Sequence, residues 1–302
     1  MHTVSGGCMS LEDSLRSWAK APGQTELNTC DNAVTAVRKA IDASAALSKH
    51  NIEVKAQGSY CNRTNVREDS DVDVCVLCTD SLMSDFPEGM QASNFGLKSP
   101  ADYGYSTFKN DVGSALTTYF KNGHVARGKK AFDIRENTYR IAADVVPCFE
   151  HRRYYKDGTW IAGTAFVPDN AGRIRNWPDQ NYDNGVAKNK DTGGRFKDVV
   201  RILKRLRYMM NDEKVPAAGP IPSYFIECLV WNAPNPTFGH DTYTEDVWAV
   251  LAHLFNNTIR WEDCEAWGEI NELKYLFWSG QPWNFYQANA FISAVWNYLG
   301  FQ

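Results

Sequence analysis

Asp71 and Asp73 lie one residue apart in the stretch DVDVCV, where every second residue is a valine. This alternation predicts a β-strand with one buried face, so the two carboxylates share the opposite face. Two like charges at adjacent positions of one face repel each other unless a cation lies between them. Carboxylate oxygens favour Mg²⁺, and Mn²⁺ is also accepted by such ligands. The spacing therefore predicts a divalent-metal site on this strand.

A third carboxylate, Asp144, stands alone among apolar residues in the stretch RIAADVVPC. Alternation predicts a strand over 139–146, and an aspartate inside such a strand needs a partner because a buried unpaired charge is costly. A two-metal phosphoryl-transfer centre uses a third carboxylate. A bare Asp-x-Asp taken by itself favours a solvated strand edge. The second aspartate-bearing strand shifts the interpretation toward a metal site built by Asp71, Asp73 and Asp144.

Gly58 and Ser59 precede the two aspartates by about a dozen residues, at the end of another predicted strand. A glycine lets the backbone turn close to a ligand. Backbone amides and the Ser59 hydroxyl are suited to hold phosphate oxygens. An ordinary turn is the commoner fate of a lone Gly-Ser pair, so its place ahead of the carboxylates is what makes it informative.

The elements that position these residues follow from periodicity. Apolar residues at helical spacing predict helices over 11–18, 30–45, 108–120, 195–210, 221–231, 247–254 and 288–299. Alternation predicts strands over 52–56, 72–76, 131–134 and 139–146, the last stopped by Pro147, and a hairpin over 152–167 that turns at Asp157-Gly158. Residues 79–107 and 168–194 have little period and are predicted as loop. The front half is thus mixed α/β and the back half helical.

Composition sets the class of protein. The chain has 302 residues, of which 43% are hydrophobic and 23% charged, and this is ordinary globular composition. A net charge of −4 argues against a protein that wraps nucleic acid by charge alone. The opening residues show no signal-peptide pattern, and no apolar run approaches a membrane span. We therefore predict a cytoplasmic location without membrane contact.

Eight cysteines are scattered through the sequence, mostly inside apolar runs. Cys75 and Cys78 form a CxxC pair, which suggests zinc or redox chemistry in other contexts. Here the pair lies along an alternating strand, where positions three apart point to opposite faces. Buried, reduced cysteines are the favoured interpretation.

The stretch GSYCNRTNVREDSDVDV, together with ADVVPC, resembles the DNA polymerase β-like nucleotidyltransferases. Within them it is similar to the bacterial cyclic oligonucleotide synthases of antiphage signalling, the CD-NTases (cGAS/DncV-like), over roughly residues 28 to 232. The resemblance implies an α+β fold: a polymerase β-like nucleotidyltransferase core, a mixed sheet with a long spine helix, plus a C-terminal helical lobe. We expect the catalytic lobe over 1–195 and the helical lobe over 196–302.

The resemblance also implies how a nucleotide is held. Gln57, Gly58 and Ser59 would lie at the donor nucleotide. Lys197, Arg201 and Lys204 form a basic stripe at helical spacing, opposite the apolar face of their helix, and Ser223 and Tyr224 follow in PSYFIECLVWN. Lys204 and Ser223 would bind donor phosphates, and Tyr224 would stack on a base. Taken alone, these residues favour a solvated basic face and a core tyrosine.

The implied reaction is template-independent joining of NTPs, ATP and/or GTP first among them, into a cyclic di- or trinucleotide. Two Mg²⁺ ions (Mn²⁺ as the alternative) would be held by the three aspartates, with Asp144 also the candidate general base. The product would reach a downstream effector. The His-Cys-Cys-Cys cluster of the animal DNA sensor is absent from the sequence, so no stable nucleic-acid partner is expected.

Two other interpretations are open. The chain is suited to a nucleotidyltransferase that modifies a small molecule, an RNA end or a protein, or to a catalytically inactive nucleotide-binding module. An RNA-end enzyme would need a longer basic track than the sequence contains. Arg127, Lys129 and Lys130 in VARGKKAFDI either contact an acceptor phosphate or are simply solvated, and the solvated interpretation is favoured.

Overall fold

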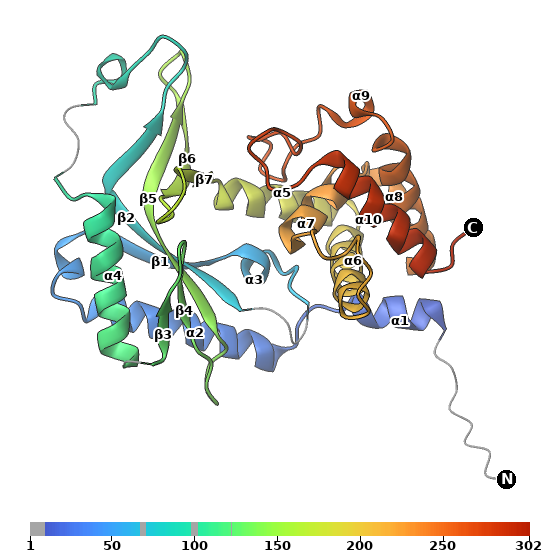
Figure 1. The fold of residues 1–302 in the computed structure, drawn as a ribbon, viewed down its shortest axis with the longest axis horizontal. Coiled ribbons are helices and arrows are strands. Elements are labelled where there is room, and N and C mark those ends of the chain that lie inside the picture. Colours follow the sequence, from blue (N-terminus) through green and yellow to red (C-terminus); the bar gives the residue numbers. More distant parts are fainter. Residues whose placement is uncertain (1–9, 67–70, 98–101, 122) are drawn as a thin grey trace. The chain divides into compact units, whose positions relative to one another are not determined.

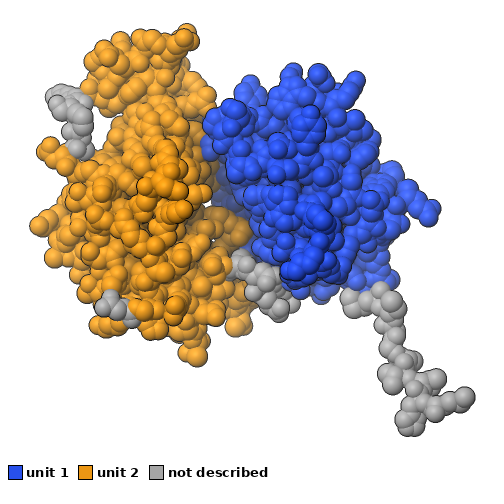
Figure 2. Space-filling view, in the orientation of Figure 1, with its two compact units in different colours: residues 1–22, 62–68, 180–302 blue, residues 23–61, 69–179 orange. Residues whose placement is uncertain are grey.

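The computed structural model describes residues 10–66, 71–97, 102–121 and 123–302. Its elements divide into two compact units (Figures 1 and 2): unit 1 holds residues 1–22, 62–68 and 180–302, and unit 2 holds residues 23–61 and 69–179. The helices are α1 (Leu11–Trp18), α2 (Gln24–Asp42), α3 (Gly58–Asn62), α4 (Tyr105–Phe120), α5 (Pro178–Asp191), α6 (Arg195–Asp212), α7 (Ser223–Trp231), α8 (Tyr243–Asn257), α9 (Trp261–Cys264) and α10 (Phe285–Tyr298), with short 3₁₀ turns at Leu47–Lys49, Ala92–Phe95 and Asn235–Thr237. The strands are β1 (Ile52–Gln57), β2 (Val72–Asp85), β3 (Val125–Arg127), β4 (Phe132–Ile134), β5 (Ala143–Tyr154), β6 (Trp160–Phe166) and β7 (Ile174–Asn176).

The seven strands of the described residues form one mixed sheet in unit 2 (Figure 1). Strands β1 and β2 are antiparallel, β2 and β5 are parallel, and β5 pairs antiparallel with β4 near its start and with β6 near its end. Strands β3 and β7 extend the sheet beside β4 and β6. The long strand β5 is therefore the centre to which the rest of the sheet is attached.

The core of unit 2 lies on one face of this sheet. The alternating valines of β2 and the apolar residues of β4 and β5 pack there against helices α2 and α4; the fully buried members include Val72, Val74, Val76, Val145 and Phe108. Burial of this face is the main stabilising contribution of such a layer. Because strand side chains alternate, the residues between these valines must point to the other face.

Strand β5 continues through Pro147, where the sequence predicted an end. In the pairings of the described residues, β4 pairs with residues 143–145 of β5 and β6 pairs with residues 149–154, so neither of these two strands lies opposite Pro147. Its carbonyl instead accepts a hydrogen bond from the Tyr105 hydroxyl at 2.9 Å. The missing N–H of proline therefore interrupts no ladder along that edge.

Two predicted loops contain regular structure. Strand β2 runs on to Asp85 beside β5, so part of 79–107 is strand. Helix α5 and strand β7 lie within 168–194, although α5 has few apolar residues and hence no helical period. Lys188 of α5 donates to the Ala233 carbonyl at 2.8 Å and to Asn235 Oδ1 at 3.0 Å. Contacts distant in sequence stabilise this helix, and a local pattern cannot register them.

Unit 1 is a helical bundle with its own apolar core. Residues of α1, α6, α7, α8 and α10 meet there, among them Leu15, Leu203, Phe225, Leu251 and Phe291. The predicted division at residue 195 differs from this arrangement. The first helix, residues 62–66 and most of α5 belong to the helical unit. Leu15 of α1 packs in its core, the Arg63 and Thr64 carbonyls accept hydrogen bonds from α6, and Lys188 of α5 bonds to Ala233.

Alanine substitutions at two glycines inside helices test how closely these helices are packed. A Cβ on Gly113 of α4 would lie 2.7 Å from Phe132 Cε1, whereas a Cβ on Gly185 of α5 meets nothing within 4 Å. We expect Gly113→Ala to destabilise by roughly 1–3 kcal/mol through overpacking. Gly185→Ala, the matched control, should stabilise its helix by up to about 1 kcal/mol. Urea unfolding of both variants measures this, and equal effects would contradict the packing described.

Candidate active site

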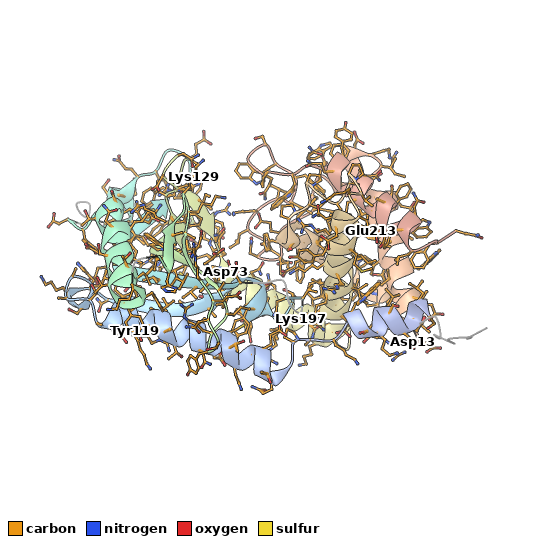
Figure 3. All side chains as sticks on the ribbon, turned by 60° about the horizontal axis from the view of Figure 1, so that its bottom comes forward. Asp13, Asp73, Tyr119, Lys129, Lys197 and Glu213 are labelled. Carbon is orange, nitrogen blue, oxygen red and sulfur yellow. The ribbon has the colours of Figure 1, made fainter. Side chains whose placement is uncertain are left out.

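Three aspartates stand side by side on neighbouring strands of the sheet. In the strand register, Asp73 of β2 pairs with Asp144 of β5, and Asp144 pairs with Asp133 of β4. Paired positions on neighbouring strands share a face, and these three alternate with the buried valines, so they lie on the face opposite the α2–α4 core. We call Asp73, Asp144 and Asp133 the carboxylate row. Figure 3 labels Asp73 on β2.

Asp71 lies just before β2 and is exposed, while Asp144 is only partly exposed. The pKa of Asp144 is raised from 3.8 to about 6, first by burial, then by the charges of Asp133 and Asp71, and by a hydrogen bond with Asp133. Asp71 is therefore close enough to act on Asp144. The structure pairs Asp73 with Asp144, and Asp71 lies two residues before Asp73, just ahead of β2. That the three hold one metal centre stays a prediction.

Asp133 is a member of the row that the sequence analysis did not identify. Its signal was present, since it is an aspartate between two buried apolar residues, Phe132 and Ile134, in a predicted strand. The same pattern drew attention to Asp144. What the pattern could not supply was the register that places Asp133 opposite Asp144.

Gly58 approaches the carboxylate row more closely than any side-chain-bearing residue could. Its φ is +67°, and a Cβ built on it would lie 2.0 Å from Asp73 Oδ2. Glycine is thus required twice, for the left-handed backbone and for the space. Ser59 follows at the start of α3, directly beside this contact, and the Tyr60 hydroxyl holds α3 to α2 through Leu27 O at 3.0 Å and Asp31 at 2.8 Å. Gln57, at the end of β1, pairs with Asp73 in the sheet.

The carboxylates of Asp71, Asp73 and Asp144 are chemically suited to bind a hard divalent cation. All of their ligating atoms are carboxylate oxygens, and burial followed by the charges of Asp133 and Asp71 raises the pKa of Asp144. Within the described ranges, no three His, Cys, Asp or Glu side chains stand close enough together to hold a metal ion as they are.

The basic stripe of α6 is buried rather than solvated. Arg201 donates to the carbonyls of Ala19 at 2.6 Å and Arg63 at 2.6 Å, and it forms an ion pair with Asp198. It therefore ties α1 and the 62–68 segment to α6. Lys197 lines a small cavity of unit 1 together with Asn62, Thr64, Asn181, Tyr182, Gly185, Phe196, Glu227 and Ile270.

Lys204, predicted to bind donor phosphates, has a partner within its own unit. Its ammonium lies 2.5 Å from Glu227 Oε1 and 3.0 Å from the Thr64 carbonyl, and both side chains of the ion pair are nearly fully buried. Glu227 was missed by the sequence analysis. A lone acid inside the apolar run of α7 was a usable signal, as it was for Asp144.

Ser223 and Tyr224 begin helix α7. The Ser223 hydroxyl lies 3.3 Å from the Tyr208 hydroxyl. The Tyr224 hydroxyl donates to either Asn181 Oδ1 at 3.0 Å or Glu269 Oε2 at 3.1 Å, so its ring is held in one orientation. Both residues belong to the helical unit, and their predicted contacts with a nucleotide stay predictions.

The remaining sequence expectations concern cysteines and membranes. Cys75 and Cys78 are buried on opposite faces of β2 in separate apolar clusters, which confirms the buried-cysteine interpretation. Among the described helices, none combines the length and apolar character needed to cross a bilayer.

An Asp-x-Asp strand paired in register with a third aspartate, next to a Gly-Ser turn, is the arrangement that the sequence analysis associated with polymerase β-like nucleotidyltransferases. Residues 183–300 match the family described as the cGAS/DncV-like nucleotidyltransferase C-terminal helical domain. A cyclic dipyrimidine nucleotide synthase CdnE of Legionella pneumophila is 44% identical over 292 residues, which is 95% of this chain and 97% of that protein. Another CdnE of the same description, from Cecembia lonarensis, is 40% identical over 96% of this chain and 98% of that protein.

Solved structures agree. The Rhodothermus marinus CdnE c-UMP-AMP synthase with Apcpp and Upnpp has a TM-score of 0.85 at 31% identity, covering 97% of both chains. The Elizabethkingia meningoseptica CdnE cyclic dinucleotide synthase with GTP and Apcpp has a TM-score of 0.82 at 32% identity, covering 97% of this chain and 100% of that one. The chain belongs to the CD-NTase family of cGAS/DncV-like nucleotidyltransferases. The predicted fold class and the predicted enzyme class, a nucleotidyltransferase that makes cyclic nucleotides, are confirmed.

The Gly58 contact gives a first test of the site. Gly58→Ala should push the Asp73 carboxylate aside and lower nucleotidyl transfer by roughly a hundredfold or more, since active-site displacements of about 1 Å cost that much. Gly89→Ala is the matched control, because Gly89 has φ +77° but nothing within 4 Å of its Cβ position. It bears the same backbone strain without the collision. Equal activity of both variants would show that the close approach has no catalytic importance.

The raised pKa of Asp144 gives a second test, made in EDTA. The folded state holds this proton up to about pH 6, whereas the unfolded state loses it near 3.8. Stability contributed by the protonated form is therefore present at low pH and is lost as pH rises through this window. Asp144→Asn should raise the melting temperature more at about pH 7.5 than at about pH 4, where wild-type Asp144 is itself mostly neutral. An equal change in melting temperature at both pH values would contradict the raised pKa of Asp144.

Proposed function

We propose that this chain joins two nucleoside triphosphates, without a template, into a cyclic dinucleotide that serves as a signal in antiphage defence. The supporting observation is the pairing of Asp73 with Asp144 across parallel strands, with Gly58 packed against Asp73. It occurs in a chain 44% identical to a protein described as a cyclic dipyrimidine nucleotide synthase. The product would act on a separate effector in the cytoplasm.

The chemistry is an in-line displacement. A ribose hydroxyl of the acceptor nucleotide attacks the α-phosphate of the donor, and pyrophosphate leaves. Asp144 would accept the hydroxyl proton, because it pairs with Asp73 in the sheet and its pKa of about 6 leaves its carboxyl mostly ionised at neutral pH. A second transfer within the linear intermediate would close the ring.

Asp71, Asp73 and Asp144 would hold the divalent cations, for which Mg²⁺ is the proposed identity and Mn²⁺ the alternative. When bound, such cations neutralise phosphate charge and lower the pKa of the attacking hydroxyl. Asp73 has the further task of fixing position, since Gly58 packs against its carboxylate. The Ser59 hydroxyl, next along the chain, would hold an oxygen of the donor triphosphate, with Gln57 beside it at the end of β1.

The helical unit would complete the donor site through Lys204, Ser223 and Tyr224. For Lys204 to bind phosphate, its ammonium must exchange Glu227 for a phosphate oxygen, because Glu227 lies 2.5 Å from it. Tyr224 is suited to hold a base, since hydrogen bonds to its hydroxyl fix the ring.

The names of the relatives bear on which bases enter the product. The sequence analysis placed ATP and/or GTP first. The relatives at 44% and 40% identity are described as dipyrimidine synthases, whereas a dipurine synthase from Elizabethkingia meningoseptica is 32% identical. We propose on this ground that at least one pyrimidine nucleotide enters the product.

The decisive assay incubates the protein with all four α-labelled NTPs and Mg²⁺, then treats the products with phosphatase. Small phosphatase-resistant products are expected, and single-NTP omissions identify the bases. Asp71→Ala with Asp73→Ala should lower the yield by several orders of magnitude, roughly as removal of other essential catalytic groups does, while circular dichroism shows an intact fold.

Other outcomes of this assay identify other functions. Labelled polymer or labelled protein would indicate an enzyme that modifies an RNA end or a protein. NTP binding without turnover in Mg²⁺ or Mn²⁺ would indicate an inactive nucleotide-binding module. Full activity in the double alanine variant would end the catalytic proposal.

A further inference from the structure

The turn between β3 and β4, residues 128–131, carries two exposed lysines, Lys129 and Lys130, that the mechanism above does not use. Figure 3 labels Lys129 in this turn. It closes through a hydrogen bond from the Gly128 amide to the Ala131 carbonyl at 2.8 Å. The sequence analysis favoured solvation for these lysines. Their surroundings in unit 2 point to a ligand instead, and the argument rests on the proposed function.

A buried lysine fixes the turn. Lys109 of α4 is 2% exposed, and its ammonium donates to the Lys129 carbonyl at 2.8 Å and to Asp169 Oδ1 at 2.8 Å. The Asp169 amide donates to the same Lys129 carbonyl at 3.0 Å. A charge buried in this way is costly unless it is fully paired. The turn is thus held by hydrogen bonds from both helix α4 and the loop that contains Asp169.

The fixed turn lies against the carboxylate row. The Cβ position of Gly128 is 3.9 Å from Asp133 Oδ1, and Asp133 pairs with Asp144 in the sheet and is hydrogen-bonded to it. Gly128, the first residue of the turn, therefore lies close to Asp133, which is paired with the proposed general base, Asp144. Lys129 and Lys130 follow Gly128 directly in the chain and are exposed, so their ammonium groups are available to a negatively charged substrate.

The order of the strands indicates whether the donor or the acceptor nucleotide lies near the lysine turn. The row runs from Asp73 on β2, where Gly58 and Ser59 lie, through Asp144 on β5 to Asp133 on β4. With neighbouring strands about 4.8 Å apart, the two ends of the row are about 10 Å apart. Donor phosphates belong at the Ser59 end. The acceptor hydroxyl belongs at Asp144, so the rest of the acceptor extends toward β4 and the lysine turn.

The triphosphate of the acceptor nucleotide stays intact during the first transfer, so its negative charge must be accommodated. In the first transfer a bond forms between the acceptor hydroxyl oxygen and the donor α-phosphorus, and the donor's α–β phosphoanhydride bond breaks. The hydroxyl proton goes to Asp144 and pyrophosphate leaves from the donor. The acceptor's own triphosphate is not cleaved, and it carries several negative charges beside a row of carboxylates. Two ammonium groups there would offset that repulsion.

We propose that Lys129 and Lys130 bind the 5′-triphosphate of the acceptor nucleotide. The enzyme would then prefer an acceptor that carries a triphosphate over one with a single phosphate. Arg127 of the same hairpin is excluded from this role, because it donates to Asn110 at 2.8 Å and stacks on Phe132 toward α4.

The test separates acceptor from donor. A labelled NTP is the donor, and the acceptor is either an α,β-methylene NTP, which cannot donate, or the matching nucleoside 5′-monophosphate. The linear dinucleotide product is quantified for each acceptor. Wild type should use the triphosphate acceptor with a kcat/KM roughly tenfold to a hundredfold higher, as one or two charged contacts predict. Lys129→Ala/Lys130→Ala should bring the two acceptors to within about twofold, mainly by raising KM for the triphosphate.

Two control variants define the outcome. Lys129→Arg/Lys130→Arg should keep the preference, and Lys156→Ala, in the exposed turn between β5 and β6, should match wild type. An equal loss with both acceptors in the double alanine variant would indicate a structural role and overturn the proposal, as would a preserved preference. A wild-type protein inactive with every NTP would overturn the proposed function, whereas an active one without acceptor preference would overturn only this inference.

Discussion

The parallel pairing of β2 with β5 sets Asp73 beside Asp144, and the function of this chain depends on that register. A slip of one residue would send either carboxylate to the apolar face and leave a buried, unpaired charge. The register is held because the valines between the aspartates are fully buried against α2 and α4. Hydrophobic packing on one face thus fixes the position of charge on the other.

Crowded carboxylates are an energetic cost that the fold carries for its chemistry. Burial and two neighbouring aspartates raise the pKa of Asp144 to about 6. A protein optimised for stability alone would not place Asp133 in the same row. The approach of Gly58 to Asp73 adds a second constraint, since it demands a backbone that only glycine adopts readily in that space. Both features are expected at a site that binds cations and substrate.

The helical unit handles charge in the opposite way. Lys204 and Glu227 are nearly fully buried and form an ion pair with each other. Arg201 donates hydrogen bonds to backbone carbonyls and forms an ion pair with Asp198. A buried ion pair of this kind contributes little net stability, but removing one partner is costly. Phosphate binding by Lys204 would therefore exchange one anion for another. The exposed lysines of the β3–β4 turn have no such internal carboxylate in the described contacts, and a substrate can use them directly.

Alternation by itself predicted that Val72, Val74 and Val76 share a buried face, and the Gly-Ser turn with the three aspartates was enough to predict the enzyme class and the α+β fold. Periodicity also predicted most helices, because one apolar face repeats within a single segment. Only the tertiary structure decided the register that adds Asp133 to the row, the burial of Lys204 against Glu227, the strand through Pro147 and the helix at α5. Each of these depends on a partner distant in sequence, and a local pattern carries no record of which distant residues will meet.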